Sequence, residues 1–202
     1  MESTNDSFYK KYVKVFLDFI ISIVSLTVFS PILLIIAIAI KLDSKGPVFF
    51  KQKRLGLYGH NFYIYKFRTM IVNAEKIGDG LSIKNENDNR ITKVGKFLRK
   101  TSLDELPQLI NLLKKEMSLI GPRPPVVYHP YKGYENYPDW TKGRFEVRPG
   151  ITGLAQIKVR NSATWEERIK YDNDYVENIS FTNDVKIFFN TFKTILSRDK
   201  IY

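Results

Sequence analysis

"VFLDFIISIVSLTVFSPILLIIAIAI", from Val15 to Ile40, is the stretch that decides how the rest of this chain is arranged. Its 26 residues carry one charge, Asp18, and a straight helix of that length would run about 39 Å. The hydrocarbon core of a bilayer is roughly 30 Å thick, so the segment is long enough to enter a membrane. It ends at Lys41 rather than at a small-residue cleavage site, and it exceeds the apolar region of a signal peptide. We therefore predict a membrane helix that is retained.

Pro31 lies near the middle of this stretch and predicts a break in the helix. A proline ring removes one backbone N–H and clashes with the carbonyl four residues earlier, here Thr27, at about 3 kcal/mol in an ordinary helix. The hydroxyls of Thr27 and Ser30 are close enough in sequence to satisfy the freed backbone groups. We predict that the helix is broken at Ser30-Pro31.

Basic residues flank the apolar segment on both sides. Lys10, Lys11 and Lys14 precede it, and Lys41, Lys45, Lys51, Lys53 and Arg54 follow it. The positive-inside tendency places both flanks in the cytoplasm, which one straight crossing cannot do. A re-entrant helix, which dips into the membrane and returns, satisfies both flanks. An ordinary single-pass anchor with a mild proline kink stays open as the alternative.

Composition narrows the class of partner. The chain has 202 residues, 44% of them hydrophobic, and no cysteine, so it can bury a core and has no disulfide or thiolate metal site. Its formal net charge of +11 predicts a polyanionic partner: nucleic acid, anionic lipid or phosphorylated substrate. Because no nucleic-acid-binding motif is present and a long apolar leader suits such a role poorly, we expect no nucleic acid partner.

The remainder of the chain predicts a mixed α and β domain, in the α+β class. Residues 47–70 contain two aromatic and β-branched runs parted by glycines, which is typical of a β-hairpin. Residues 102–117 have apolar side chains at helical spacing. We expect residues 1–45 to form an N-terminal tail and the re-entrant helix, and residues 46–202 to form one cytosolic domain.

The C-terminal part, from Thr164 onward, predicts two helical pieces split near "NISFTND". The last piece, "NDVKIFFNTFKTILSRDK" (183–200), groups its apolar residues toward one side. An amphipathic helix lying on anionic lipid has this pattern, and so does a helix packed on a protein core. Both interpretations stay open for this helix.

Two adjacent acids, Asp104 and Glu105, open the helix predicted over residues 102–117. In one interpretation they belong to a capping box, with Ser102 as the N-cap and Glu105 at the third helical position, which leaves Asp104 without a role. In the other, helix N–H groups and nearby cations lower a carboxylate pKa and keep it ionised, as a nucleophile or metal ligand requires. Two acids are enough for Mg²⁺, which takes one or two carboxylates plus substrate phosphates.

Five basic residues occupy loop-like or turn-flanked stretches, where phosphate-binding side chains tend to lie. They are Lys66, Arg99, Arg123, Arg148 and Arg160. For any one of them alone, an exposed ion pair is the ordinary explanation. Together with one acidic pair and a membrane segment, they suggest phosphoryl chemistry on a lipid.

An ordered set of motifs over about 190 residues resembles the monotopic phosphoglycosyl transferases, bacterial sugar transferases that prime glycan assembly on polyprenyl phosphate. The motifs are "FSPILL" (29–34), "FYIYKFRTM" (62–70), "SLDELPQLINLL" (102–113), "MSLIGPRPP" (117–125), "VRPGITGLAQIKVRN" (147–161) and "YDNDYVENISFTNDVKIFF" (171–189). One departure is that Lys14 is followed by Val15, where relatives often carry paired basic residues, so we expect altered lipid headgroup contacts there. The resemblance also implies a minimal member, without the multi-helix extension of longer sugar transferases.

The resemblance implies a role for each candidate site residue. Asp104 is the nucleophile that attacks the β-phosphate of a UDP-sugar, releases UMP and carries the phosphosugar until polyprenyl (undecaprenyl) phosphate takes it. Glu105 assists with Mg²⁺ or protons. The further assignments are Pro122, Arg123 and Pro124 on the nucleotide, Lys66, Arg99, Arg148 and Arg160 on phosphates, and Ser30 and Pro31 at the helix break.

The resemblance also implies a place in the cell and a set of partners. We expect the cytosolic face of the bacterial inner membrane, with both termini cytosolic, an anionic phospholipid surface and downstream glycosyltransferases. N-acetylated or bacillosamine-type amino sugars are the expected donors, while plain hexoses and a homodimer stay open. The competing hypothesis is a nonenzymatic membrane-anchored adaptor that binds anionic lipid and needs no nucleophile.

Overall fold

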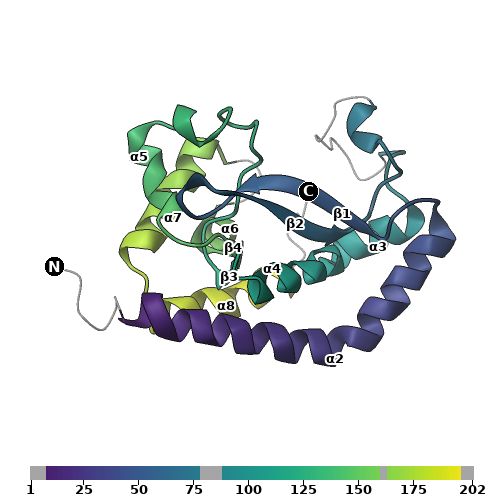
Figure 1. Ribbon diagram of the computed structural model, residues 1–202, viewed down its shortest axis with the longest axis horizontal. Coiled ribbons are helices and arrows are strands. Elements are labelled where there is room, and N and C mark those ends of the chain that lie inside the picture. Colours follow the sequence, from purple (N-terminus) through teal and green to yellow (C-terminus); the bar gives the residue numbers. More distant parts are fainter. Residues whose placement is uncertain (1–7, 78–87, 160–162, 197–202) are drawn as a thin grey trace.

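The computed structural model describes residues 8–77, 88–159 and 163–196 (Figure 1). Its helices are α2 (Lys14–Asp43), α3 (Lys93–Thr101), α4 (Leu109–Leu113), α5 (Asp139–Lys142), α6 (Leu154–Lys158), α7 (Trp165–Glu177) and α8 (Phe181–Leu196). Its strands are β1 (Phe49–Leu55), β2 (Asn61–Phe67), β3 (Ser118–Ile120) and β4 (Gly150–Thr152). The mixture of helices and short strands confirms the expected fold class.

Helix α2 is continuous over 30 residues and extends a π-helical turn at Tyr9–Val13. Among the described residues, Tyr9–Asp43 is the one helix long and apolar enough, by length and composition, to cross a membrane. Figure 1 shows that α2 runs along the base of the domain and then bends upward beside α3. Pro31 is inside this helix, so the predicted break is a bend within an unbroken helix.

The serine before Pro31 compensates the carbonyl that the proline leaves free. Ser30 Oγ donates to the Thr27 carbonyl at 2.8 Å, and that carbonyl is the one facing the proline ring. Thr27 Oγ1 in turn donates to the Ile23 carbonyl at 2.9 Å. The predicted role is confirmed for the Ser30 hydroxyl, which satisfies the carbonyl freed by Pro31, whereas the Thr27 hydroxyl binds a carbonyl that the proline does not free.

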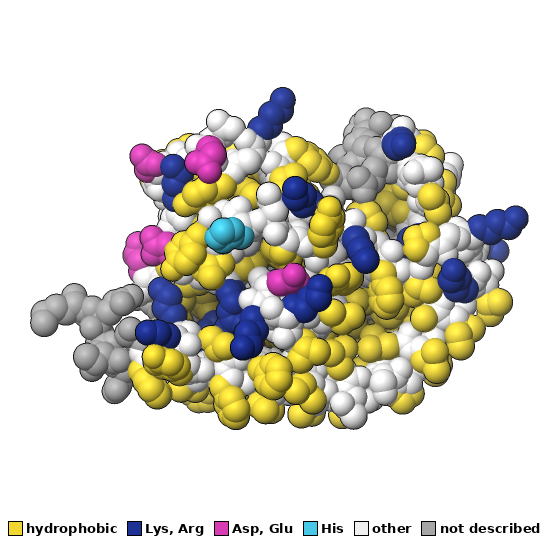
Figure 2. Space-filling model, viewed as in Figure 1, with side chains coloured by type: hydrophobic (Ala, Val, Ile, Leu, Met, Phe, Trp, Pro, Cys, Tyr) yellow, Lys and Arg dark blue, Asp and Glu magenta, His cyan; other side chains and the backbone are white. Residues whose placement is uncertain are grey.

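One face of α2 packs on the domain, and the opposite face is exposed. Lys14, Asp18 and Ser22 are buried at intervals of four residues, followed by Ile36 and Ile40. The exposed apolar residues are Phe16, Ile20, Ile23, Val24, Val28, Phe29, Ile32, Leu34, Ile35, Ile38 and Leu42. Figure 2 shows apolar side chains gathered along the lower edge, where α2 lies. An exposed apolar surface of this extent marks a site of interaction with a membrane or a partner.

Two separate two-stranded sheets form the β part of the domain. β1 and β2 are an antiparallel hairpin with Phe49 opposite Phe67 and Leu55 opposite Asn61, which confirms the predicted hairpin. β3 and β4 pair in parallel, with Ser118 opposite Gly150. The sequence analysis did not predict this second pair, because three-residue strands carry no usable periodicity.

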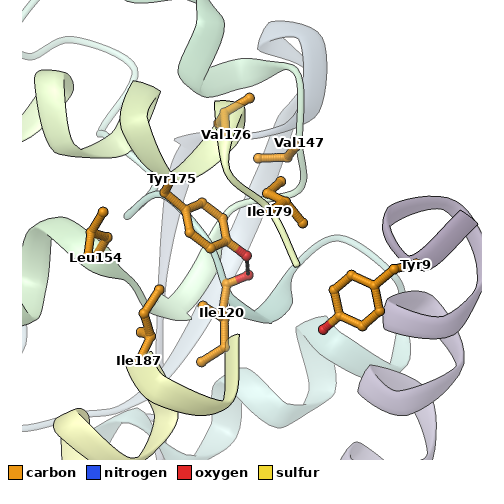
Figure 3. Close-up of a cluster of buried hydrophobic side chains, with 8 residues drawn as sticks. All are labelled: Tyr9, Ile120, Val147, Leu154, Tyr175, Val176, Ile179 and Ile187. Atoms are coloured by element: carbon orange, nitrogen blue, oxygen red, sulfur yellow. Dashed lines mark hydrogen bonds between the residues drawn. The ribbon is translucent and has the colours of Figure 1, made fainter. Parts of the chain in front are cut away.

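A buried apolar cluster joins the start of α2 to β3, α7 and α8 (Figure 3). It comprises Tyr9, Ile120, Val147, Leu154, Tyr175, Val176, Ile179 and Ile187. Tyr175 lies at its centre, and its hydroxyl oxygen lies 3.2 Å from the Ile120 carbonyl oxygen. The helices α7 and α8 are separate, as the split near "NISFTND" predicts.

The cluster is completed by a buried carboxylate, Asp184 of α8. It accepts hydrogen bonds from the hydroxyls of Tyr9 and Tyr175, both at 2.7 Å, and from Lys14 Nζ at 2.5 Å. Lys14 is 7% exposed, so its charge is paired inside the protein, and the expectation of altered lipid headgroup contacts at this position stays a prediction. Asp184 thereby fastens the beginning of α2 to the C-terminal helices.

Helix α8 has a side that packs on the core and a side that exposes apolar residues. Ile187 is 1% exposed and belongs to the core, whereas Phe181, Phe189 and Phe192 are exposed on the other side. The ring of Phe181 lies 5.9 Å from that of Tyr9, so the exposed edge of α8 begins beside α2. The helix packs on the core and also presents an apolar surface outward.

Replacement of Asp184 by Ala is expected to lower the free energy of unfolding by about 3–5 kcal/mol, because Lys14 would remain buried without its counter-ion. Thermal unfolding of the purified protein in detergent measures the loss. Asp139→Ala is the matched control, since the Asp139 side chain is 97% exposed in its 2.8 Å pair with Lys142. Equal midpoints for wild type and Asp184→Ala would contradict the role assigned to this carboxylate.

Candidate active site

The two adjacent acids lie on a 3₁₀ helix rather than on the α-helix predicted over residues 102–117. This 3₁₀ helix, Leu103–Gln108, follows α3 and leads into the short helix α4. Pro107 falls inside it and has no N–H for a helical hydrogen bond, and Ser102 before it has a left-handed backbone (φ 56°). The chain then reaches β3 at Ser118, so the long predicted helix is wrong in type and in length.

The predicted capping box at Ser102 is also wrong. The backbone N–H of Glu105 donates to the Ser102 carbonyl at 3.2 Å, and the Glu105 side chain binds Lys66. A capping box is formed elsewhere, between Thr164 and Glu167 at the start of α7. Helix capping therefore explains neither acid.

Glu105 is held by two cations from different elements. Lys66 Nζ of β2 lies 2.5 Å from Glu105 Oε1, and Arg123 Nη2 lies 3.5 Å from the same oxygen. Burial alone would raise the pKa of Glu105, but Lys66 and Arg123 outweigh it and lower this pKa to about 2. The Glu105 carboxylate is thus ionised at any physiological pH. This agrees with the interpretation in which nearby cations lower the pKa of a carboxylate in the acidic pair.

Asp104 has the opposite electrostatic environment. Burial raises its pKa, the charge of Glu105 raises it further, and Lys66 and Arg99 oppose the rise without cancelling it. The expectation of a lowered pKa is wrong for this residue, because Lys66 forms its hydrogen bond with the neighbouring carboxylate. The ionised form of Asp104 is therefore less well stabilised by its surroundings than that of Glu105.

The remaining cation of this group, Arg99, comes from the last turn of α3. Its Nε donates to Thr69 Oγ1 at 2.9 Å, which directs the guanidinium toward the segment after β2. The structure therefore brings together Lys66, Arg99, Asp104, Glu105 and Arg123 from the hairpin, α3, the 3₁₀ helix and the loop after β3.

The loop that contains Pro122, Arg123 and Pro124 lines a pocket of about 160 Å³, part of it open to solvent. Its other lining residues are Leu55, Gly56, Pro125, Arg144, Phe145, Val147 and Pro149. The loop follows β3 directly, and β3 is held against β4 by close backbone contact. A Cβ on Gly150 would lie 2.1 Å from the Gly121 nitrogen, so no larger residue fits there.

One predicted phosphate-binding residue, Arg148, is not placed with this group. Arg148 pairs with Asp18 of α2 at 2.9 Å and donates to the Met117 carbonyl at 3.3 Å. Its side chain is largely buried in this pair with Asp18, so Arg148 contacts the apolar helix and not the two acids. Arg160 lies outside the described residues.

Two arginines beside the proline-rich loop were missed by the sequence analysis. Arg54 Nη1 donates to the Pro124 carbonyl at 2.9 Å, and Arg144 Nη2 donates to the Arg123 carbonyl at 2.6 Å. The sequence signal that could have identified Arg54 is its place in a strand. It follows the inward-facing Gln52 by two residues, so its side chain lies on the same face of the strand. A cation at an inward strand position requires acceptors from elsewhere in the fold.

The described residues contain no group of three or more His, Cys, Asp or Glu side chains that could hold a metal ion. Asp104 and Glu105 provide two adjacent carboxylates, and one Glu105 oxygen is engaged by Lys66. Mg²⁺ takes few protein ligands and keeps several positions for water and phosphate oxygens. The donor set therefore fits Mg²⁺ as a partial site that a bound diphosphate would complete.

The opposite pKa shifts predict opposite effects of two conservative changes. Above its raised pKa the ionised Asp104 costs stability, so Asp104→Asn is expected to raise the thermal midpoint at pH 7.5. The gain should shrink as the pH falls through that pKa. Ionised Glu105 contributes stability, so Glu105→Gln should lower the midpoint at pH 7.5, and this difference should close between pH 4.5 and about 2. Midpoint shifts of the same sign, measured with chelator present, would refute the assignment.

Comparisons with known proteins agree with the motifs in this site. A family model described as bacterial sugar transferase matches residues 9–198. The chain is 39% identical over 191 residues to a UDP-glucose:undecaprenyl-phosphate glucose-1-phosphate transferase of Caulobacter vibrioides, covering 92% of this chain and 70% of the relative. A protein of the same name from Klebsiella pneumoniae is 46% identical over 192 residues, covering 90% of this chain and 40% of the relative.

A third relative, the undecaprenyl-phosphate galactose phosphotransferase of Salmonella typhimurium, is 38% identical over 205 residues, covering 95% of this chain and 42% of that protein. The chain thus spans about two fifths of the length of the Klebsiella and Salmonella relatives. The matched part includes all the site residues described above.

Proposed function

Because this chain belongs to the bacterial sugar transferase family, we propose that it is a membrane-bound phosphoglycosyl transferase. It moves a sugar-1-phosphate from a UDP-sugar to polyprenyl (undecaprenyl) phosphate and releases UMP, as the first membrane step of glycoconjugate synthesis. The observation that carries the proposal is that Asp104 and Glu105 lie together among the cations of the hairpin, α3 and the loop after β3. A mere lipid-binding surface has no use for a half-buried carboxylate whose charge is poorly stabilised.

In the first step, a carboxylate oxygen of Asp104 attacks the β-phosphorus of the UDP-sugar. A bond forms between that oxygen and phosphorus, the bond from phosphorus to the bridging oxygen breaks, and UMP leaves with the electron pair. The raised pKa of Asp104 supports this role, because its charge is poorly stabilised and its oxygen is correspondingly nucleophilic. The product is an aspartyl phosphosugar.

In the second step, a phosphate oxygen of polyprenyl phosphate attacks the phosphorus of this acyl phosphate. The new bond gives the lipid-linked diphosphate sugar, and the Asp104 carboxylate is released unchanged. An acyl phosphate is reactive enough to pass its group to another phosphate, so two easier displacements replace one difficult one.

The surrounding residues supply charge stabilisation. Lys66, Arg99 and Arg123 neutralise the phosphoryl oxygens, and Mg²⁺, when bound beside the carboxylates, would supply further positive charge to the diphosphate. Of the two roles expected for Glu105, metal and charge support is favoured over proton transfer, because a pKa of about 2 leaves no proton to give near neutral pH.

Helix α2 is proposed to be re-entrant, entering the cytosolic leaflet of the bacterial inner membrane and returning. Its beginning is fastened to the domain by Lys14 and Asp184. Its end is fastened to the same domain, since Asp43 accepts from the Val94 N–H at 2.9 Å and Arg68 binds the Ser44 carbonyl at 2.7 Å. Two ends tied to one folded domain cannot lie on opposite sides of a bilayer, which favours re-entrance over a single crossing.

The exposed side of α8 is proposed to rest on the same lipid surface. Phe181, Phe189 and Phe192 are exposed, and Lys186 and Lys193 lie on the same helix where they can meet anionic headgroups. Figure 1 places α8 at the base of the domain, next to the first half of α2. The two helices would hold the active site at the height of the lipid phosphates.

Incubation with polyprenyl phosphate, Mg²⁺ and a panel of UDP-sugars is expected to release UMP with at least one donor. The names of the relatives put UDP-glucose, UDP-galactose and UDP-N-acetylgalactosamine first in the panel, followed by other amino sugars. Without acceptor, intact-mass analysis should show one phosphosugar adduct. Asp104→Asn should lose the adduct and lower UMP release by roughly 10³-fold or more.

Asp139→Asn, at an exposed carboxylate outside the site, is the control for that experiment and should keep both signals. Asp104→Asn that turns over nucleotide-sugar at the wild-type rate would remove the proposed mechanism. A wild-type protein that binds anionic vesicles but releases no UMP with any donor would instead support the membrane adaptor.

The natural absence of cysteine makes the topology testable with single-cysteine variants. Asn5→Cys marks the N-terminal tail, and Tyr58→Cys marks an exposed position at the hairpin turn. In cells with a permeable outer membrane, an impermeant maleimide should label neither variant until the inner membrane is opened. Labelling of Asn5→Cys alone from the periplasm would establish a single crossing and exclude the re-entrant arrangement.

A further inference from the structure

The proline-rich loop after β3 has four successive carbonyls, and each is held by a donor from another element. The Pro122 carbonyl accepts from the Gly150 N–H at 2.9 Å, and the Pro125 carbonyl accepts from the Leu55 N–H at 3.0 Å. Prolines at positions 122, 124 and 125 have no N–H, so the loop cannot form a ladder of its own. Backbone groups of β4 and β1 therefore fix its two outer carbonyls.

The two inner carbonyls, those of Arg123 and Pro124, are held differently. Arg144 Nη2 donates to the Arg123 carbonyl at 2.6 Å, and Arg54 Nη1 donates to the Pro124 carbonyl at 2.9 Å. Figure 1 shows the hairpin that carries Arg54 reaching across the domain toward α5 and α7. Two guanidinium groups thus hold the middle of the loop from separate elements.

Arg54 lies where a positive charge is energetically unfavourable. Its second amino group, Nη2, donates to Gln52 Oε1 at 2.6 Å, and its Nε is buried without a hydrogen-bond partner among the described residues. Burial lowers the pKa of Arg54 to about 10, and the nearby charge of Arg123 lowers it too. A half-buried cation whose hydrogen bonds go to an amide and a carbonyl, and whose Nε is buried, costs stability, so the position requires a compensating role.

Arg144 is fixed from the opposite side. It pairs with Asp172 of α7 at 2.9 Å, and both side chains are at most 3% exposed. Its guanidinium lies 5.7 Å from the ring centre of Trp165, at the start of the same helix. Arg144 is therefore a rigid support, whereas the Arg123 side chain is 41% exposed and reaches Glu105 at only 3.5 Å.

Resting on the function proposed above, we propose that Arg54 and Arg144 are positioning residues that clamp the two inner carbonyls of the loop and so aim Arg123 at the donor diphosphate. They act through Arg123 rather than on substrate. The loop backbone is held still while the exposed Arg123 guanidinium remains able to move from Glu105 to a phosphate. The polyprenyl phosphate acceptor, which arrives from the membrane side, does not depend on this clamp.

A double-mutant cycle tests this inference, with Arg54→Lys, Arg123→Gln and the combined variant. Lysine keeps the charge at position 54 but has one compact head that cannot bridge Gln52 and the Pro124 carbonyl. Arg54→Lys is expected to lower kcat/KM for the UDP-sugar by about 10- to 100-fold, the effect of a displacement on the order of 1 Å. The KM for polyprenyl phosphate should stay within about 2-fold of wild type.

In the Arg123→Gln background the same Arg54→Lys change should cost less than about 3-fold, because its effect passes through a side chain that is already gone. Arg144→Lys keeps a charge opposite Asp172 and should show the same donor-selective loss and the same coupling to Arg123. Equal fold-losses with and without Arg123, or equal changes in the donor and acceptor KM, would overturn the inference.

Arg90→Lys is the matched control. Arg90 is 8% exposed and donates to the carbonyls of Ala74 and Ile77, away from the proline-rich loop. Any loss of activity in Arg90→Lys should be proportional to the loss of folded protein. It should be the same with and without the Arg123→Gln change. Calorimetric titration measures the affinity of each variant for UDP and so gives the same double-mutant cycle without turnover. A wild-type enzyme that binds UDP but releases no UMP would refute the proposed reaction and leave the clamp to be judged from the UDP affinities.

Discussion

Asp184 accepts hydrogen bonds from Tyr9, Lys14 and Tyr175, and this buried contact determines where the apolar helix begins. Without this pairing, a charged lysine at the end of an apolar segment would be free to contact the membrane surface. Pairing it inside the domain fixes the first half of α2 under β3 and α8. The Arg148–Asp18 pair one turn further along repeats the same solution. The position of the active site relative to the apolar surface follows from these two ion pairs.

The second half of α2 is tied back to the domain by different means, with Ile36 and Ile40 packed against Phe67 and Leu98. Between the two attachments lie Pro31 and the hydroxyl of Ser30 that compensates it. The bend thus lies between two attachments, in which the two ends of one helix pack on different apolar clusters of the same domain. Its exposed convex side is almost entirely apolar, so the shape of the helix and its surface chemistry point to the same environment.

The site itself depends on an uneven distribution of charge between neighbours in sequence. Lys66 and Arg123 stabilise Glu105, and burial then leaves Asp104 with too little support for its own charge. Such a carboxylate lowers the stability of the fold. Reactive groups in active sites are commonly held at a similar loss of stability. The loop around Arg123, held by β1, β4 and the guanidinium groups of Arg54 and Arg144, completes the same site from its other side.

The sequence by itself determined the long apolar helix, its bend, the β-hairpin and the acidic pair, because each is specified within a few residues. Composition, a proline and its preceding serine, alternating side chains between glycines, and adjacent acids in a known motif are all local signals. The tertiary structure alone decided that Asp104 and Glu105 differ in pKa, that Lys14 is buried, and that Arg148 meets Asp18 across 130 positions. It also decided the three-residue parallel pair β3–β4. Burial and the distance between charges depend on which distant segments pack together, and no periodicity within a segment records that.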